Sequence, residues 1–280
     1  MTGTTNAHRS NAHIHPTALI SEEAVIADDV VVGAYSIIEG RVRIGAGTVL
    51  HARAHLIGPL TIGEGNEIYS NALIGEKPQH MMYKDEPTSV EIGDNNVLRE
   101  NVTIHRGTTG SWLTKIGNGN YLMAGAHVAH DGRVGNKCIL ANNSLIGGHV
   151  ELADNVFISG NAAVHQFCRM GRLSFLSGTS GTTKDIPPFI IQQNINHVVG
   201  VNIIGMRRAG LSSAQINAIR RVYHIMYLQH LSVPNAIVEA EAELGHIDVV
   251  QEYIRFVRES KRGINGCVEG SDGMLGLAAA

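Results

Sequence analysis

The stretch IHPTALISEEAVIADDVVVGAYSIIEGRVRI, residues 14–44, has a branched aliphatic residue at every sixth position. The same step continues far beyond it, with two interruptions and with Met170 as its one unbranched member. The series runs over residues 14–74, 92–104 and 116–176. Glycine often follows the aliphatic residue, as at Gly33, and glycine tolerates backbone angles that other residues resist. We therefore expect a tight corner after each aliphatic position.

The period of six indicates the fold class. It is too short for a helical hairpin and does not match the 3.6-residue repeat of an amphipathic helix. An inward aliphatic residue and a small inward residue four positions later, as at Ile14 and Ala18, describe a short strand and a turn. Three such hexads make one triangular coil. The pattern predicts an all-β parallel β-helix, whose coils stack ~4.8 Å apart and cover one another's apolar interior.

The pattern changes after Leu176, and the pair Pro187-Pro188 is expected to end the repeat. From Ser212 a helical period begins, with Ser212 and Gln215 forming a capping box. Further helices are expected to start near Pro234 and near Ile247. The predicted organisation is a disordered N-terminus over residues 1–12, the β-helix over 13–190, a helical domain over 191–262 and a disordered tail over 263–280.

Composition and charge exclude several classes of protein. A formal net charge of −3 gives no electrostatic footprint for nucleic acid. The three cysteines have no spacing that suggests disulfides or a metal site, so we expect reduced thiols and a cytoplasmic protein. The first ten residues have no apolar core of a secretory signal, and no apolar run is long enough to span a membrane.

The coil period places distant histidines together. Val128, Ile146 and Val164 follow one another at intervals of three hexads, so they stack in one column, and a histidine follows each of them within three positions. Removing the two interruptions brings His105 to the same corner and makes both inserted segments leave from that edge. The histidines of this corner are His105, His127, His130, His149 and His165. A single surface histidine is usually only solvated, but this set beside two insertions favours a site for proton-transfer chemistry.

Several motifs resemble one family, the acyl-ACP–UDP-N-acetylglucosamine O-acyltransferases, which begin lipid A synthesis. The likeness extends over residues 13–260. The motifs are DEPTSVEIGD at 85–94, LRENVTIHRGT at 98–108, AHVAHD at 126–131, NKCILANN at 136–143, AVHQFC at 163–168, DIPPF at 185–189 and GVNIIGMRR at 200–208. The resemblance implies left-handed coils and a homotrimer with a cleft between neighbouring prisms.

The resemblance also implies the reaction. An (R)-3-hydroxyacyl chain passes from the phosphopantetheine arm of acyl carrier protein to the glucosamine 3-hydroxyl of UDP-N-acetylglucosamine, with no metal and no further cofactor. It makes His130 the general base, Asp131 its orienting carboxylate and the backbone N–H of Gly148 the oxyanion donor. It assigns substrate contacts to Gln79, His127, His149, His165, Gln166, Asn202, Arg207 and Arg208, and acyl-chain length to Gly178.

Two departures from the family pattern leave the acceptor and the nucleotide contacts open. His80 and Met82 stand where the family has an acid and a lysine, so a 3-amino sugar acceptor with amide formation is an alternative. Ile204 and Ala209 stand where the family has an acid and an arginine, which predicts fewer contacts to the nucleotide. The sequence is also compatible with an acyltransferase that uses another donor or acceptor, with a zinc enzyme resembling carbonic anhydrase, and with an inactive scaffold.

Overall fold

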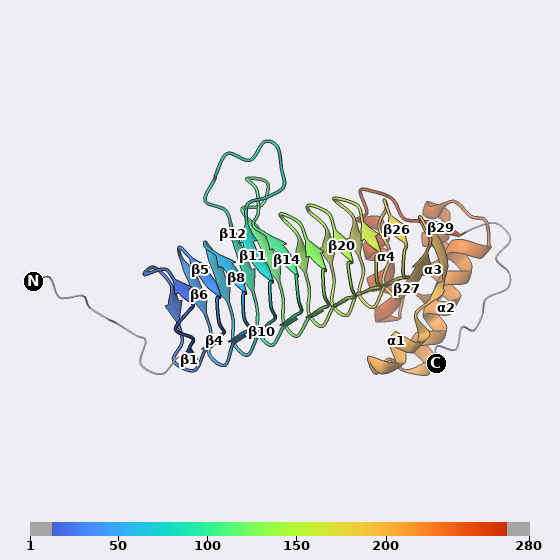
Figure 1. The fold of residues 1–280 in the computed structure, drawn as a ribbon. Coiled ribbons are helices and arrows are strands. Elements are labelled where there is room, and N and C mark those ends of the chain that lie inside the picture. Colours follow the sequence, from blue (N-terminus) through green and yellow to red (C-terminus); the bar gives the residue numbers. More distant parts are fainter. Residues whose placement is uncertain (1–12, 268–280) are drawn as a thin grey trace, which may run out of the picture.

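The computed structural model describes residues 13–267 and shows a parallel β-solenoid with a group of helices at its C-terminal end (Figure 1). Successive short strands join three sheets in turn, so each sheet forms one face of a triangular shaft, and we name these faces sheets A, B and C. Sheet A contains β1 (His13–Ile14), β4 (Val31–Val32), β7 (Val49–Leu50), β10 (Glu67–Ile68), β13 (Val97–Leu98), β16 (Tyr121–Leu122), β19 (Ile139–Leu140), β22 (Phe157–Ile158), β25 (Phe175–Leu176), β27 (Ile190–Gln193), β28 (His197–Val201) and β29 (Gly266–Cys267).

The other two faces are built in the same way. Sheet B contains β2 (Leu19–Ile20), β5 (Ile37–Glu39), β8 (His55–Ile57), β11 (Leu73–Glu76), β14 (Thr103–His105), β17 (His127–Val128), β20 (Leu145–Ile146), β23 (Ala163–Val164) and β26 (Gly181–Thr182). Sheet C contains β3 (Val25–Ile26), β6 (Val42–Ile44), β9 (Leu60–Ile62), β12 (Ser89–Ile92), β15 (Leu113–Ile116), β18 (Arg133–Val134), β21 (Glu151–Leu152) and β24 (Arg169–Met170).

The predicted stacking register is confirmed. Val128 pairs with Ile146, three hexads further along the chain, and across the interruptions Ile74 pairs with Ile104 and Ile104 with Val128. From Ile26 to Leu176 every aliphatic residue of the series is buried. Burying such a side chain stabilises a fold by about 1.5–3 kcal/mol, so the repeated column supplies most of the driving force for coil stacking.

The glycines after the aliphatic residues have a different role from the one predicted. Of these glycines only Gly75 has a positive φ, at 88°. A Cβ built on Gly33 would lie 2.7 Å from the backbone nitrogen of Ala52 in the next coil, so glycine is needed there for close approach. Left-handed backbone instead occurs two residues after such glycines, as at Tyr35 after Gly33 and Asn95 after Gly93. The prediction about backbone angle was wrong.

The solenoid also extends beyond Leu176. β26 and β27 continue sheets B and A, and Phe175 pairs in parallel with Ile191. Pro187-Pro188 does not break the repeat, because the Pro188 ring packs at a corner where Gly171 has no side chain. β27 spans the boundary predicted at residue 190, and β28 then turns back antiparallel to it.

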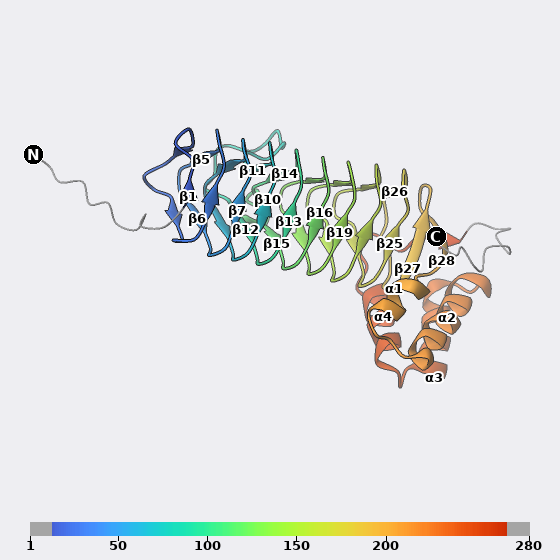
Figure 2. The same ribbon diagram turned by 60° about the horizontal axis from the view of Figure 1, so that its bottom comes forward.

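In the part of the chain that the structure describes, four helices follow the last coil and lie to one side of the solenoid end (Figure 2). The helices are α1 (Ile203–Arg208), α2 (Ser213–Leu228), α3 (Val233–Leu244) and α4 (Asp248–Arg258). The predicted capping box is present, since Ser212 Oγ accepts from the Gln215 N–H at 3.2 Å and Gln215 Oε1 from the Ser212 N–H at 2.9 Å. Only α1 was not predicted.

The segment after α4 has a defined structure up to residue 267. Residues 263–267 return to the solenoid, where β29 pairs with β28, so the prediction of a disordered tail is wrong for these residues. Buried Asn265 fixes the segment with a 2.9 Å hydrogen bond to Thr182 Oγ1. Residues 1–12 and 268–280, also predicted to be disordered, lie outside the described residues.

Within residues 13–267 the structure shows the state of two cysteines and the length and apolarity of each helix. Cys138 and Cys168 are free and buried, and burial raises their pKa, to about 12 and about 11. None of the four helices combines the length and apolarity that a membrane crossing requires.

Candidate active site

The corner between sheets B and C carries the histidine cluster, as the sequence predicted. His105 ends β14, His130 and His149 follow β17 and β20, and His165 follows β23. Both insertions, residues 77–88 and 106–112, run between sheet B and sheet C and project from this edge (Figure 1).

His130 and Asp131 form a buried pair at the centre of this corner. The Nδ1–H of His130 donates to Asp131 Oδ2 at 2.8 Å. His130 is 9% exposed and Asp131 2% exposed. Because Nδ1 carries the proton in this contact, Nε2 of His130 is left as an acceptor. The pair therefore has the arrangement of a general base held by a carboxylate.

The Asp131 carboxylate is held by the second insertion. Oδ1 accepts from the Thr108 N–H and from the N–H and hydroxyl of Ser111, and Oδ2 accepts from the Thr108 hydroxyl at 2.7 Å. Burial alone would raise the pKa of Asp131, but the hydrogen bonds from His130, Ser111 and Thr108 outweigh it and hold the pKa well below its usual range. Asp131 therefore stays ionised and stabilises a protonated His130.

Gly148 packs directly on the His130 ring. A Cβ on Gly148 would lie 2.5 Å from Cε1 and 2.8 Å from Nε2 of His130, so no other residue fits without moving the imidazole. Within residues 13–267 no hydrogen bond uses the Gly148 N–H, whereas its carbonyl accepts from the Phe167 N–H at 2.9 Å. A free N–H beside the basic nitrogen suits an oxyanion donor.

Two further imidazoles flank His130. The ring centroid of His149 lies 5.4 Å away and that of His80, from the first insertion, 5.2 Å away, both edge-on. His149 Nε2 also lies 3.4 Å from Asp131 Oδ2, and its ring stacks on Phe167. Burial lowers the pKa of His149 despite the nearby Asp131. At least one ring beside the base therefore favours the neutral state.

His127 and His105 form a second layer of the cluster. Their rings meet edge-on at 5.1 Å, and His127 Nδ1 lies 2.7 Å from Thr103 Oγ1. Burial lowers the pKa of His127 to about 4 and also lowers that of His105. Both are therefore neutral at physiological pH and suit hydrogen bonding to an uncharged sugar.

The remaining residues predicted for this corner are exposed. His165 and Gln166 follow β23, one coil beyond His149. Gln79 lies in the first insertion, next to the His80 ring that contacts His130. All three side chains are exposed, so they are accessible to a substrate.

Four predicted site residues lie at other corners of the chain. Gly178 follows β25 at the corner between sheets A and B. Asn202 caps α1 and donates to the carbonyl of Leu173, at the corner between sheets C and A. Arg207 and Arg208 are exposed in the last turn of α1, on the side of the shaft away from the insertions (Figures 1 and 2). Within one chain they do not join the histidine cluster.

Sequence reasoning missed the residues that hold Asp131. These are Thr108 and Ser111, together with Thr114, whose hydroxyl accepts from the Asp131 N–H at 2.8 Å. All three belong to the stretch GTTGSWLT, at and just after the second insertion. The usable signal was a loop rich in hydroxyl residues leaving the same edge as an aspartate that must be buried beside a base.

The corner offers three potential metal ligands, His130, Asp131 and His149. They do not fit a metal ion well. Both Asp131 oxygens already accept hydrogen bonds, five in total with His130, which fills the acceptor capacity of a carboxylate. The Nδ1 to Oδ2 distance of 2.8 Å is that of a hydrogen bond rather than of two zinc ligands.

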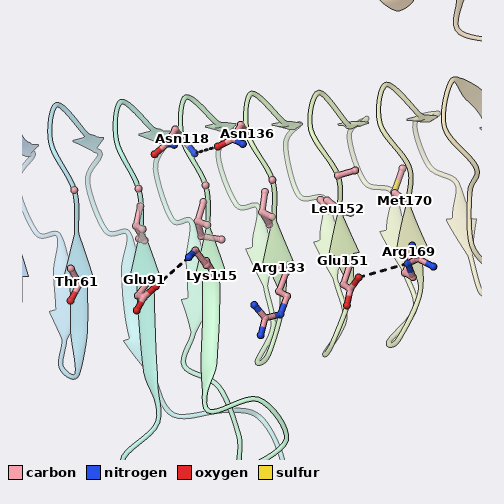
Figure 3. Close-up of a pocket in the computed structure, with 18 of the residues that line it drawn as sticks. Thr61, Glu91, Lys115, Asn118, Arg133, Asn136, Glu151, Leu152, Arg169 and Met170 are labelled. Atoms are coloured by element: carbon pink, nitrogen blue, oxygen red, sulfur yellow. Dashed lines mark hydrogen bonds and ion pairs between the residues drawn. The ribbon is translucent and has the colours of Figure 1, made fainter. Parts of the chain in front are cut away.

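A separate groove lies on the outer face of sheet C (Figure 3). It has a volume of about 680 Å³, and Phe256 of α4 is among the residues that line it. Along it a row of charged side chains includes the pairs Glu91–Lys115 and Glu151–Arg169, at 3.6 and 3.7 Å. None of the histidines lines this groove, so it is not the site described above.

Comparisons with known proteins agree with the motifs. A family model described as "Udp N-acetylglucosamine O-acyltransferase; Domain 2" matches residues 185–265. The acyl-[acyl-carrier-protein]–UDP-N-acetylglucosamine O-acyltransferase of Anaeromyxobacter sp. (strain Fw109-5) is 44% identical over 211 residues, which are 75% of this chain and 82% of that protein.

Solved structures show the same likeness. The UDP-N-acetylglucosamine O-acyltransferase of Moraxella catarrhalis has a TM-score of 0.87 and 39% identity, covering 90% of this chain and 99% of that one. The enzyme of Francisella novicida has a TM-score of 0.86 and 33% identity, covering 95% and 98%. The predicted fold class, a left-handed parallel β-helix followed by helices, is confirmed. The chain therefore belongs to the family of acyl-[acyl-carrier-protein]–UDP-N-acetylglucosamine O-acyltransferases.

Proposed function

We propose that the protein transfers an (R)-3-hydroxyacyl chain from acyl carrier protein to the glucosamine 3-hydroxyl of UDP-N-acetylglucosamine, the first step of lipid A biosynthesis. One observation carries the proposal: the bare Nε2 of His130, held by ionised Asp131, lies against Gly148, whose N–H makes no hydrogen bond within residues 13–267. The names of the relatives give oxygen as the accepting atom, so the 3-amino acceptor suggested by His80 is not favoured.

The geometry supports a single addition step followed by collapse. His130 Nε2 accepts the proton of the sugar hydroxyl as that oxygen attacks the thioester carbonyl carbon. The Gly148 N–H donates to the oxyanion that forms, and Asp131 stabilises the imidazolium. The C–S bond then breaks, and the thiol of the phosphopantetheine arm leaves with the proton from His130. No metal or further cofactor takes part in this proposal.

We further propose a homotrimer that packs through sheet A. The outer face of sheet A carries a half-buried apolar stripe that runs along the shaft in register, interrupted by Glu67. Its members are Val31, Val49, Val97, Tyr121, Ile139, Phe157, Phe175 and Ile191. An extended apolar stripe of this kind favours a protein interface.

A neighbouring chain would also complete the site. Gly178, Asn202, Arg207 and Arg208 lie at corners other than the histidine corner, and only a second copy can bring such positions to it. In this arrangement Arg207 and Arg208 of a neighbour bind the diphosphate, and Gly178 leaves room for the acyl chain. A cytoplasmic location fits the free thiols of Cys138 and Cys168.

Phe157→Asp is expected to convert the trimer to monomers and to reduce acyl transfer by more than 100-fold. Its ring stacks on Phe175 at 4.9 Å toward the C-terminal end of the stripe, and a carboxylate there would lose its hydration in the interface. Light scattering gives the oligomeric state and circular dichroism the fold. Thr61→Asp, an exposed change on the outer face of sheet C, is the control and should stay trimeric and active. A trimeric, active Phe157→Asp protein would reject the packing through sheet A.

The proposed reaction is tested directly by mass spectrometry. Purified protein is incubated with hydroxyacyl carrier proteins of several chain lengths and with UDP-N-acetylglucosamine or its 3-amino analogue. The expected product is the 3-O-acyl nucleotide sugar. If only the amino analogue is acylated, the proposed acceptor atom is wrong.

Exhaustive treatment with a chelator is expected to leave transfer unchanged within about twofold. The reason is that Asp131 has no free lone pair for a metal while Ser111 and Thr108 hold it. Elemental analysis confirms removal, and the rate before and after decides. A loss of activity that zinc restores would support the alternative of a zinc enzyme.

A further inference from the structure

The segment after α4 reaches the histidine corner with a guanidinium group. Ser260 Oγ donates to Asp185 Oδ2 at 2.7 Å, and buried Asn265 donates to Thr182 Oγ1 and to Gln192. These contacts hold residues 260–265 across the last coil, and Arg262 between them is half-buried.

Arg262 is oriented by a backbone carbonyl. Its Nε and Nη2 both donate to the Thr183 carbonyl, at 3.2 and 2.8 Å. With the guanidinium group held in this orientation, its Nη2 atom also lies 3.3 Å from Nδ1 of His165. A cation from the far end of the chain thus contacts an imidazole of the proposed active site.

Two groups compete for the Nδ1 atom of His165. The Gln166 carbonyl lies 3.1 Å away and can only accept, so it favours a proton on Nδ1. The Arg262 guanidinium can only donate, so it favours a bare Nδ1. A charge-assisted hydrogen bond is roughly twice as strong as a neutral one, and an N–H facing a guanidinium is repelled. The contact with Arg262 therefore prevails.

We propose that Arg262 is a positioning residue that fixes His165 in the tautomer with the proton on Nε2. The inference rests on the proposed function for its role in catalysis. His165 is exposed, and in this proposal its Nε2–H donates a hydrogen bond to an oxygen of the acyl donor's arm. His130 has the opposite tautomer, because its Nδ1–H donates to Asp131. In this proposal His130 accepts a proton during the reaction, and His165 donates a hydrogen bond.

The tautomer is tested without substrate by NMR of the full protein with ¹⁵N-labelled histidine. The His165 signals are assigned as those missing from His165→Asn. In the unaltered protein Nε2 should be protonated and Nδ1 bare. In Arg262→Met the proton should move to Nδ1, toward the Gln166 carbonyl, whereas Arg262→Lys and the neighbouring control Lys261→Met should keep the original tautomer. The same tautomer in Arg262→Met would overturn the proposal.

Kinetics test the role in catalysis. Arg262→Met is expected to raise KM for the acyl carrier protein about tenfold, as for one lost hydrogen bond, with kcat and KM for the nucleotide sugar within threefold. In a His165→Gln background, where the amide N–H donates without a tautomer, Arg262→Met should add nothing. An equal rise in KM in both backgrounds would reject a role through His165. If the unaltered protein shows no transfer, the proposed function fails while the NMR result still decides the tautomer.

Discussion

His130→Ala is expected to lower the rate of acyl transfer by about 10²–10⁴-fold, the usual contribution of a general base. A sugar hydroxyl attacks a thioester slowly unless its proton is accepted during attack, and Nε2 of His130 is the bare nitrogen of the buried pair. Steady-state kinetics with acyl carrier protein and UDP-N-acetylglucosamine measures the loss, which should appear in kcat because the proton is transferred only in the transition state.

The fold should survive this change. Removing the ring leaves Asp131 buried, but Thr108 and Ser111 still donate four hydrogen bonds to it. Thermal unfolding should therefore shift by only a few degrees. His55→Ala is a matched control, since that ring bonds Glu39 at 2.7 Å, outside the histidine corner, and its loss should not change the rate. Transfer by His130→Ala within tenfold of the unaltered protein would remove His130 as the base.

The column of the solenoid was predictable because each coil repeats the same burial problem. Every sixth side chain is aliphatic and must point into the interior of the shaft. The spacing alone therefore predicts that Val128 and Ile146 stack on each other. Insertions can leave such a shaft only at its edges, and together with the period this constraint predicts that His105 and His130 lie at one corner.

Other features depended on contacts between coils, which a period does not contain. The glycine at position 33 is required by the backbone of Ala52 in the next coil, a distance that no local pattern encodes. Pro187-Pro188 fits inside the repeat because Gly171 makes room for it, so a local rule about proline failed for a tertiary reason. The ordered residue Asn265 is likewise held by distant polar partners rather than by its own period.

The distribution of the site residues has a further physical reason. A triangular shaft has three corners, and the motif resemblance assigned roles without saying which corner each residue occupies. His130 and Gly148 share one corner because they are a full coil of three hexads apart, whereas Gly178 lies five hexads beyond Gly148 and falls one corner short of the column. The period of three hexads thus explains why a single chain brings His130 and Gly148 together but not Gly178.

Gly148→Ala is expected to reduce transfer by at least about 10²-fold, although it adds a single methyl group. Its Cβ would lie 2.5 Å from the His130 ring, so the imidazole must move away from Asp131 or the coil must open. Either movement separates the base from the N–H that is proposed to bind the oxyanion, and the loss of one such donor costs about 10²–10³-fold. Overpacking should also lower the free energy of unfolding, by about 1–3 kcal/mol.

Gly160→Ala provides the control that separates crowding of the base from a general intolerance of the repeat. Gly160 and Gly148 each stand two positions after an aliphatic residue of the series, Ile158 and Ile146. At Gly160 the added Cβ would meet only the Asn142 carbonyl, at the ordinary distance of 3.4 Å, so rate and unfolding should change little. Rate constants and thermal unfolding are measured for both variants. If Gly148→Ala retains full activity, the ring of His130 does not need its observed position, and the assignment of base and oxyanion donor to this corner fails with it.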